Sequence, residues 1–332
     1  MRRVCWLSLL TVMACCCNLQ EKKDVVWQAP DTARIPGTDE GRLIRYGRDL
    51  IANTAYYLGP KGAVGAYTNG MNCQNCHLEA GTRCWGNNYS AVFSTYPKYR
   101  DRSGSVEDIS RRINDCFQRS LNGRPLDSNS REMKAIAAYL KWVGHEVPKG
   151  VKPTGAGIRE LPYLNRAANP EKGRMVYQQN CMRCHGASGA GSFNADSSGY
   201  LYPPLWGDHS FTSAAGLFRL SRLAGYVKDN MPLDRTQDKP LLTDEEAWDV
   251  AAFINSGPRP EKAFPADWPN IARKPVDHPF GPYADTFTVR QHKFGPFGPI
   301  QQAHGEGYRH HAATRFAATS SDSSWLPGWP GN

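Results

Sequence analysis

Apolar side chains recur at helical spacing in four segments of this chain, and the segments form two pairs. They are residues 41–58, 133–143, 170–179 and 245–254. In the first segment Tyr46, Leu50 and Ile51 lie near helical spacing, and at the start of the fourth Thr243 and Glu246 form a capping box. We therefore expect four helices, with the early helix of each pair crossed by the late one.

A fifth helix is expected between the two helices of the first pair. Ile113, Cys116 and Phe117 share one face of this helix. The spacing of Ser105 and Asp108 fits a helix cap and predicts that the helix begins near Ser105.

Each early helix leads into the pentapeptide Cys-x-x-Cys-His, which occurs at residues 73–77 and again at residues 181–185. Two cysteines at this spacing can form thioethers to the vinyl groups of a haem, and the adjacent histidine can take the proximal position on the iron. A zinc half-site or a redox cysteine pair is the alternative for one copy, but a second copy ending in histidine argues against it. We therefore expect two covalently bound haem c groups, held by Cys73, Cys76, His77, Cys181, Cys184 and His185.

These features predict a mainly α fold with two class I cytochrome c domains in tandem and a Pro-rich C-terminal arm. The 332 residues have room for two domains of about 100 to 150 residues each, plus the ends. Pro- and Gly-rich stretches suggest where the parts divide. The expected divisions are a signal peptide at 1–14, a tether at 15–38, a first cytochrome c domain at 39–148, a linker at 149–168, a second cytochrome c domain at 169–257, an extended arm at 258–300 and a disordered tail at 301–332.

The first residues resemble an export signal. Arg2 and Arg3 precede an apolar run that is too short to span a bilayer. The run ends in Val-Met-Ala-Cys, which resembles a lipoprotein cleavage box, so Cys15 is a candidate for lipidation, with plain secretion as the alternative. In bacteria, haem is attached to this pentapeptide outside the cytoplasm. We expect a periplasmic protein, and a lipid at Cys15 is its one candidate contact with the membrane.

Net charge excludes one class of partner. The formal charge is +9 at pH 7, and the propionates of two haems would oppose it. The sequence holds no basic run interleaved with aromatic residues. We therefore expect no nucleic-acid partner.

Met231 is expected as the sixth iron ligand in the second domain. It stands in the tripeptide Asn-Met-Pro, 46 residues after His185, where class I cytochromes commonly place a loop methionine. Lys228 and His209 are rival ligands, and a methionine that only packs is a further alternative.

Cys116 is the candidate sixth ligand in the first domain, because Met133 lies inside the expected closing helix. Cys116 follows His77 by 39 residues, and Arg112 lies one turn earlier on the same helix face. A guanidinium near a thiol favours the thiolate, which is both an iron ligand and a nucleophile. The alternative is a buried cysteine without a chemical role.

Several separated stretches can now be compared with known families. They are residues 70–82, 99–104, 112–120, 132–135, 202–207 and 230–232. Together they resemble the dihaem thiosulfate dehydrogenase family, the tetrathionate-forming cytochromes, over roughly residues 40 to 300.

The resemblance implies an enzyme that oxidises two thiosulfates to tetrathionate, a reaction that many members also run in reverse. It implies that the N-terminal haem, with His77 and Cys116 as axial ligands, is catalytic. The second haem, with His185 and Met231, would pass electrons to an external cytochrome c or copper protein. Some members have a lysine just before the methionine; this chain has Asn230, so we expect no switch between lysine and methionine ligation.

The resemblance also assigns a substrate site. The anion-binding arginines of the family correspond by their offset from the ligand cysteine to Arg102 and Arg112. Two guanidiniums can hold the sulfonate oxygens of thiosulfate, while Cys116 acts as a sulfur nucleophile and forms an S-thiosulfonate adduct. A solvated arginine face is the alternative interpretation of these two residues.

Two other functions remain open from the sequence, and one cysteine is unexplained. The chain could be a dihaem electron carrier without its own substrate, or a haem subunit of the Sox sulfur-oxidation complex.

Cys84 stands where related sequences often carry a proline. A disulfide between Cys84 and Cys116 would block the nucleophile, whereas a free Cys84 would pack beneath the haem edge.

Overall fold

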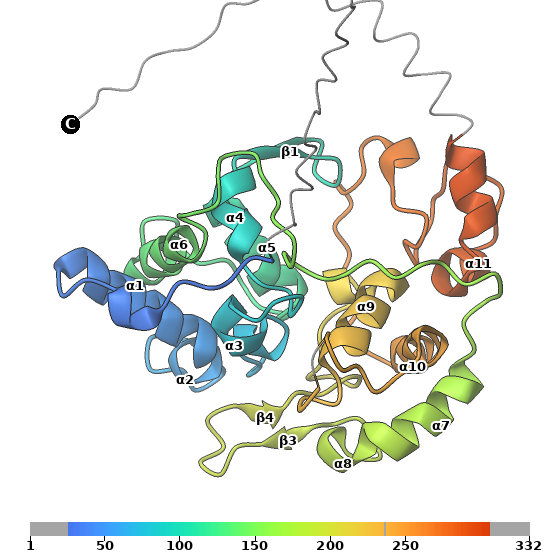
Figure 1. Cartoon of the computed structure of the whole chain (residues 1–332), viewed down its shortest axis with the longest axis horizontal. Helices are drawn as coiled ribbons and strands as arrows, with labels where there is room; N and C mark the ends of the chain where they lie inside the picture. The colour runs from blue at the N-terminus through green and yellow to red at the C-terminus, as the bar shows by residue number, and fades with distance from the viewer. Residues whose placement is uncertain (1–25, 236, 306–332) are drawn as a thin grey trace, which may run out of the picture.

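The computed structural model describes residues 26–235 and 237–305 and divides into two helical halves with a C-terminal segment that contacts both (Figure 1). The expected signal peptide at 1–14 and the lipidation candidate Cys15 lie outside the described residues, as does most of the expected tail at 301–332. In the part of the chain that the structure describes, no helix is both long and apolar enough to cross a bilayer.

The first half is built around two crossing helices, α1 (Asp39–Ala52) and α6 (Arg131–Val143). A Cβ at Gly47 would lie 2.0 Å from the carbonyl oxygen of Ala135, so only glycine permits this close crossing. Between the two helices come α2 (Thr54–Leu58), η2 (Cys73–Asn75), α3 (Leu78–Gly81), α4 (Ser90–Thr95), the antiparallel pair β1 (Lys98–Arg100) and β2 (Ser105–Glu107), and α5 (Ile109–Arg119).

The second half repeats this plan with α7 (Pro170–Asn180) and α10 (Asp244–Ser256). Gly173 has the same role as Gly47, because a Cβ there would lie 1.9 Å from the carbonyl oxygen of Asp249. The capping box of Thr243 and Glu246 is confirmed at the start of α10. The other elements are α8 (Met182–His185), the antiparallel pair β3 (Ser192–Phe193) and β4 (Tyr200–Tyr202), η3 (Gly216–Phe218) and α9 (Leu220–Asn230).

The predicted helices are confirmed with two differences. The helix expected over 41–58 ends at Ala52 and resumes at Thr54, where the Thr54 hydroxyl donates to the carbonyl of Leu50 and accepts from the amide of Cys73. The helix expected from Ser105 begins only at Ile109. Its cap is Asp108, which accepts from the amide of Arg111, while residues 105–107 pair with β1. Residues 105–107 form a local hairpin with residues 98–100 across the turn 101–104, which the helical spacing of the residues that follow does not record.

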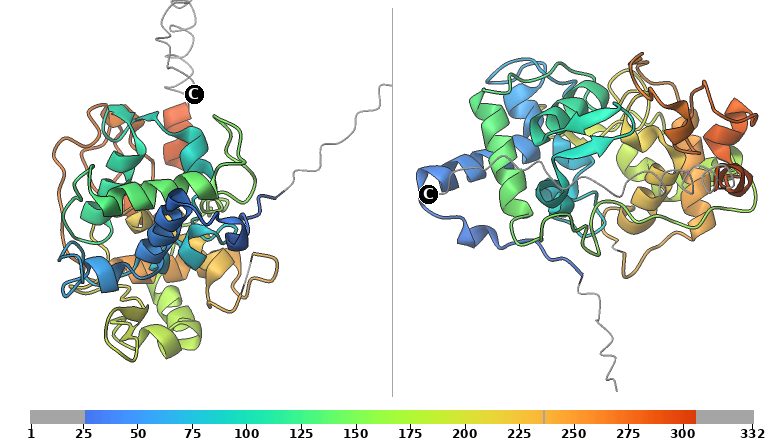
Figure 2. Two further views of the ribbon diagram at one scale, coloured as in Figure 1. Left: turned by 90° about the vertical axis from the view of Figure 1, so that its left-hand side faces the viewer. Right: turned by 90° about the horizontal axis from the view of Figure 1, so that it is seen from above.

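The segment 258–300, expected to be an extended arm, contains the short helices η4 (Ile271–Arg273) and α11 (Val289–Phe294), and residues 298–300 begin a further helical stretch that continues to residue 305. Phe297 and Ile300 follow α11 and are buried in the core of the second half. Earlier in the segment, Asp267 pairs with Arg119 of the first half. We call residues 258–300 the arm; in the right-hand view of Figure 2 it is coloured orange to red and lies mainly beside the second half.

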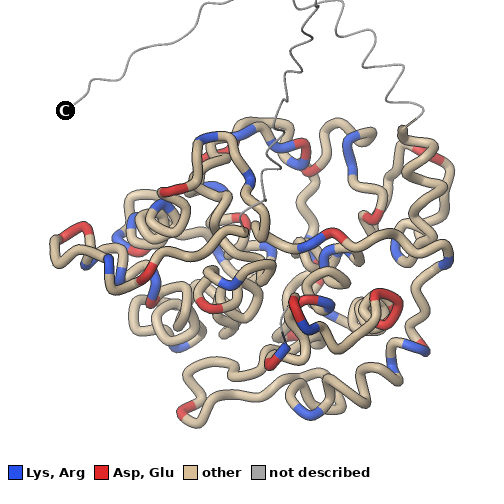
Figure 3. Tube along the Cα trace, in the orientation of Figure 1, with Lys and Arg blue, Asp and Glu red and all other residues tan. Residues whose placement is uncertain are grey.

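Basic and acidic positions are interspersed along the described chain rather than separated onto two faces (Figure 3). Inside the molecule the distribution of charge differs, because arginines are concentrated in the lining of a cavity at the junction of the two halves.

Candidate functional site

Two cavities lie beside the two Cys-x-x-Cys-His segments. The first, here the Cys116 cavity, has a volume of about 420 Å³ and is lined by Cys73, Cys76, His77 and Cys116. The second, here the Met231 cavity, has a volume of about 580 Å³ and is lined by Cys181, Cys184, His185 and Met231. The tertiary structure therefore brings each predicted pair of axial ligands to one cavity.

His77 is held in the state that an iron ligand needs. Its Nδ1 lies 2.5 Å from the carbonyl oxygen of Asn87, a contact that only a protonated nitrogen can make, so the lone pair resides on Nε2. Burial lowers the pKa of His77 to about 4, which keeps the ring neutral. The ring of Tyr89 stacks on the imidazole with 4.5 Å between centroids and fixes its plane.

Cys116 lies on α5 within reach of a guanidinium. Nη1 of Arg112, one helical turn earlier, donates to Sγ of Cys116 over 2.9 Å. The electrostatic interaction with the sulfur of Cys116 is the largest cause that raises the pKa of Arg112 above its usual value. Met133, the alternative first-half methionine, is buried in the core of that half and is not among the described residues that line the Cys116 cavity.

Arg102 enters the same cavity from the turn between β1 and β2. Its guanidinium pairs with Asp115, which also accepts from Nε of Arg119 over 3.1 Å. Although burial opposes ionisation, the positive charges of Arg102 and Arg119 hold the pKa of Asp115 below its usual value. The side chain of Arg102 is therefore fixed in place by a carboxylate next to Cys116.

The cavity is more basic than the sequence indicated. Its described lining holds one carboxylate, Asp115, and seven cationic side chains: Arg100, Arg102, Arg112, Arg119, Lys152, Arg219 and Arg222. Arg219 and Arg222 come from the start of α9 in the second half, and Trp268 comes from the arm. Sequence reasoning missed these residues because they are distant along the chain; only the i, i+3 spacing of the two α9 arginines marks them locally. Arg100, Arg219 and Arg222 pair with the carboxylates of Glu107, Asp277 and Glu160, which offset part of this charge, and the remaining surplus of cations favours an anion in the cavity.

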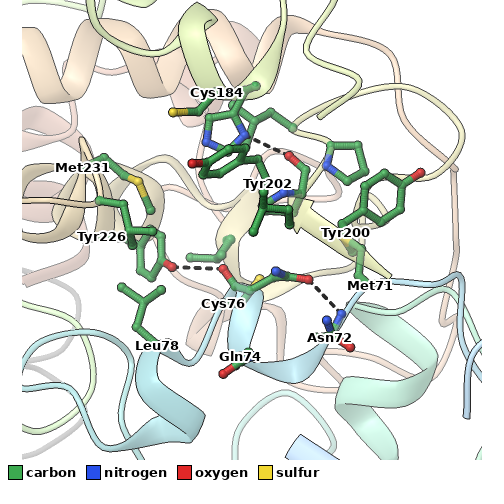
Figure 4. A pocket seen from close by; sticks show the side chains of 18 of the residues that line it. Met71, Asn72, Gln74, Cys76, Leu78, Cys184, Tyr200, Tyr202, Tyr226 and Met231 are labelled. Atoms are coloured by element: carbon green, nitrogen blue, oxygen red, sulfur yellow. Dashed lines mark hydrogen bonds between the residues drawn. The ribbon is translucent and has the colours of Figure 1, made fainter. Parts of the chain in front are cut away.

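The Met231 cavity has a similar histidine. Nδ1 of His185 lies 2.9 Å from the carbonyl oxygen of Pro203, and burial lowers the pKa of the imidazole, so Nε2 again carries the lone pair. Figure 4 shows Met231 and Cys184 on two sides of this pocket. Lys228 and His209 are not among its described lining residues, and the Lys228 ammonium pairs with Asp244 at 2.7 Å.

The two cavities meet at the segment that carries the first cysteine pair. Asn72, Cys76, Phe211 and Leu217 line both. The hydroxyl of Tyr226, on α9, donates to the carbonyl of Asn75 over 3.0 Å (Figure 4). Both halves therefore contribute to one continuous site.

Cys84 and Cys116 are both free thiols, so the structure contains no disulfide between them. Cys84 packs against Gly155, where an added Cβ would lie 2.7 Å from its Sγ. It is not among the described residues that line either cavity.

The residues present fit haem c. Each cavity places paired cysteines beside a neutral imidazole whose Nδ1 is engaged by a backbone carbonyl, the outer contact typical of metal-bound histidine. The same fit holds for both copies of the motif.

The family comparisons agree with this geometry. The model described as "SoxA/TsdA, cytochrome c domain" matches residues 65–148, and the model described as "Cytochrome C oxidase, cbb3-type, subunit III" matches residues 168–254. The chain is thus a c-type cytochrome with two mainly helical cytochrome c domains, a class that binds haem c and transfers electrons.

Similar proteins of known function show which family of c-type cytochromes the chain belongs to. A thiosulfate dehydrogenase of Psychrobacter arcticus is 38% identical over 73% of this chain and 71% of its own length. One of Allochromatium vinosum is 37% identical over 77% of this chain and 91% of its own. A solved thiosulfate dehydrogenase (TsdBA) from Marichromatium purpuratum, "as isolated" form, matches with a TM-score of 0.66 and 30% identity; the match covers 71% of this chain and 50% of that one. The chain belongs to the thiosulfate dehydrogenase family and is an oxidoreductase.

Proposed function

We propose that this protein joins two thiosulfates into tetrathionate at the Cys116 cavity and passes the two electrons to an external acceptor. The observation that carries the proposal is the 2.9 Å contact from Nη1 of Arg112 to Sγ of Cys116, inside a cavity that His77 also lines. An electron carrier without a substrate needs neither a sulfur nucleophile nor a cationic cavity around it.

Two haem c groups are proposed, one in each cavity. Cys73, Cys76, His77 and Cys116 would hold the first, and Cys181, Cys184, His185 and Met231 the second. One-electron transfer is the chemistry that these groups supply when bound, and the residues shared by the two cavities support a route from the N-terminal to the C-terminal centre.

Arg102 and Arg112 are proposed to bind the substrate sulfonate. Thiosulfate is a dianion, and a forked guanidinium can donate two parallel hydrogen bonds to two of its sulfonate oxygens. Both arginines line the cavity next to Cys116, and Asp115 orients Arg102. The bound anion would present its terminal sulfur to the cysteine.

The proposed reaction balances in two steps. The Cys116 thiolate and the terminal sulfur of one thiosulfate form an S–S bond and release two electrons, which leaves a cysteine S-thiosulfonate. A second thiosulfate then attacks the outer sulfur of the cysteine S–S bond, tetrathionate forms, and Cys116 leaves as a thiolate. Arg112 stabilises the thiolate both at the start and at the end. The reverse order of the same steps reduces tetrathionate.

The acceptor is proposed to be a small cytochrome c or copper protein, and the proposed location is the periplasm. Support comes from the haem-attachment motifs at residues 73–77 and 181–185, which require maturation outside the cytoplasm.

The test compares the oxidised wild-type holoprotein with Cys116→Ala by low-temperature electron paramagnetic resonance and by thiosulfate-dependent reduction of ferricyanide. We expect a low-spin thiolate signal that disappears together with the activity in the variant. Turnover that survives in Cys116→Ala would exclude Cys116 as the sulfur nucleophile. Wild-type protein that does not reduce ferricyanide with thiosulfate would favour the alternative function of an electron carrier without its own substrate.

A further inference from the structure

We propose that Asp267, in the arm, is a positioning residue for the substrate anion. It would act on Arg102 through Arg119 and Asp115. The inference rests on the proposed function, in which Arg102 binds the sulfonate of thiosulfate.

The four side chains form an unbroken chain of ion pairs, of which Arg102, Asp115 and Arg119 line the Cys116 cavity. Asp267 accepts two hydrogen bonds from Arg119, at 2.6 Å from Nη1 and 2.7 Å from Nη2. Nε of the same guanidinium donates to Oδ1 of Asp115 over 3.1 Å, and Oδ2 of Asp115 accepts from Arg102. Arg119 thus uses all three nitrogens, two toward the arm and one toward the site.

The side chains of this chain of ion pairs are largely shielded from water, so the removal of one charge is expected to disturb its partners. Arg119 is 9% exposed, Arg102 and Asp115 are each 15% exposed, and Asp267 is 21% exposed. Ion pairs of this kind are screened less than surface pairs, and loss of one partner leaves the other charge poorly solvated.

The arm also fixes the main chain of Arg102 and the plane of Arg119. The amide of Trp268 donates to the carbonyl of Arg102 over 2.6 Å. The ring of Phe264 lies 3.7 Å from the Arg119 guanidinium carbon, a cation–π contact. Three residues within a short stretch of the arm, Phe264, Asp267 and Trp268, therefore converge on this one wall.

Loss of the Asp267 carboxylate should release Arg102. In Asp267→Asn one of the two acceptor oxygens becomes an amide NH2, so Arg119 loses one of its two hydrogen bonds to residue 267 together with the negative charge that holds it. The guanidinium can then turn and donate two hydrogen bonds to Asp115. When both oxygens of Asp115 accept from Arg119, they are less available to accept a hydrogen bond from Arg102. Arg102 would then sample several rotamers, and the anion would bind to a site that is not preorganised.

A matched control is available in the same arm. Asp101 pairs with Arg273 at 3.0 Å and also ties the arm to the first half, but both side chains are 40% exposed or more and neither lines the Cys116 cavity. Asp267→Asn and Asp101→Asn each remove one carboxylate charge with little change in shape. Only the first removes a charge from the chain that ends at Arg102.

The experiment measures steady-state thiosulfate oxidation by holoprotein with ferricyanide as acceptor. For Asp267→Asn we expect KM for thiosulfate to rise about tenfold, with kcat within about threefold of wild type, as for the loss of one charge-assisted hydrogen bond in the binding site. Asp101→Asn should keep the wild-type KM. If the two variants change KM equally, Asp267 only attaches the arm to the first half, and the inference is wrong.

A double-mutant cycle tests the path. Arg102→Lys and Asp267→Asn should each raise KM, and the double variant should be little worse than Arg102→Lys alone, because Asp267 acts through Arg102. Additive effects would show that Asp267 acts elsewhere.

Binding without turnover separates this inference from the proposed function. Calorimetric titration of Cys116→Ala holoprotein with thiosulfate should give a Kd that rises about tenfold when Asp267→Asn is added. If wild type does not oxidise thiosulfate but this shift is found, the proposed reaction fails and the positioning role stands. If the Kd does not change, or Cys116→Ala binds no thiosulfate, the positioning role is wrong.

Discussion

Nη1 of Arg112 and Sγ of Cys116 lie 2.9 Å apart, one turn from each other on α5. Because both residues belong to one helix, their separation is set by helix geometry and hardly depends on the rest of the fold. Arg111, the preceding residue, lies about 100° further round the helix axis, is 53% exposed, and donates to Ser105. Arg112 is therefore a candidate catalytic residue, and its neighbour Arg111 is a suitable control.

Arg112→Gln should lower kcat/KM for thiosulfate by about 10²-fold or more, because a buried charge that stabilises the thiolate is lost. Arg111→Gln should remain within about twofold of wild type, since a surface charge contributes little. Both are measured by ferricyanide reduction at saturating and limiting thiosulfate. Similar losses in the two variants would contradict the role of Arg112.

Met231→His should lower the midpoint potential of one of the two proposed haem centres by on the order of 0.1 V, because a thioether ligand raises the potential relative to imidazole. Met175→Leu is the control, since Met175 is exposed on α7 and does not line the Met231 cavity. Spectroelectrochemical titration of both variants checks this. Unchanged potentials in Met231→His would exclude Met231 as a ligand.

Gly47→Ala should destabilise the holoprotein by about 2–3 kcal/mol, because its Cβ would lie 2.0 Å from the carbonyl oxygen of Ala135 and would force α1 away from α6. At Gly37 a Cβ would meet nothing within 4 Å, so Gly37→Ala should be neutral or slightly stabilising. Guanidinium unfolding of the two variants gives the comparison. A small effect at Gly47 would mean that the helices can separate without cost.

Asp277 should make the stability of the second half depend on acid pH. Burial opposes its ionisation, yet Arg219, whose Nε donates to Oδ1 over 2.9 Å, and Ser221 hold its pKa below the usual value. A depressed pKa contributes stability that is present above the unfolded-state pKa of about 4 and is lost as pH falls through the folded-state value.

Asp277→Asn should therefore cost about 2–4 kcal/mol at pH 7 and distinctly less near pH 3, measured by urea unfolding at both pH values. The control is Asp39→Asn, because Asp39 pairs with Arg42 while 94% exposed and should contribute under about 0.5 kcal/mol. A cost for Asp277→Asn that does not depend on pH would show that shape rather than charge accounts for it.

The sequence by itself determined the local features of this protein. The pentapeptides at residues 73–77 and 181–185, the crossing helices and the capping box of α10 are all coded within a few turns of chain, and the structure contains the predicted helices and the cap. The arrangement of Arg112 and Cys116 also follows from spacing alone, since a helix places residues four apart on one face. The start of α5 was misjudged because residues 105–107 form a short hairpin with residues 98–100, which the helical spacing of α5 does not record.

Only the tertiary structure decided which distant charges surround Cys116. Arg219 and Arg222 reach the cavity because α9, an element of the second domain, lies against the first domain, and Asp267 reaches Arg119 because the arm returns to the first domain over 148 residues of sequence. No periodicity records such contacts, because they depend on how whole domains pack rather than on the spacing of neighbouring side chains. The spacing of residues therefore specified the haem motifs and the candidate nucleophile, whereas domain packing specified the cationic environment in which that nucleophile lies.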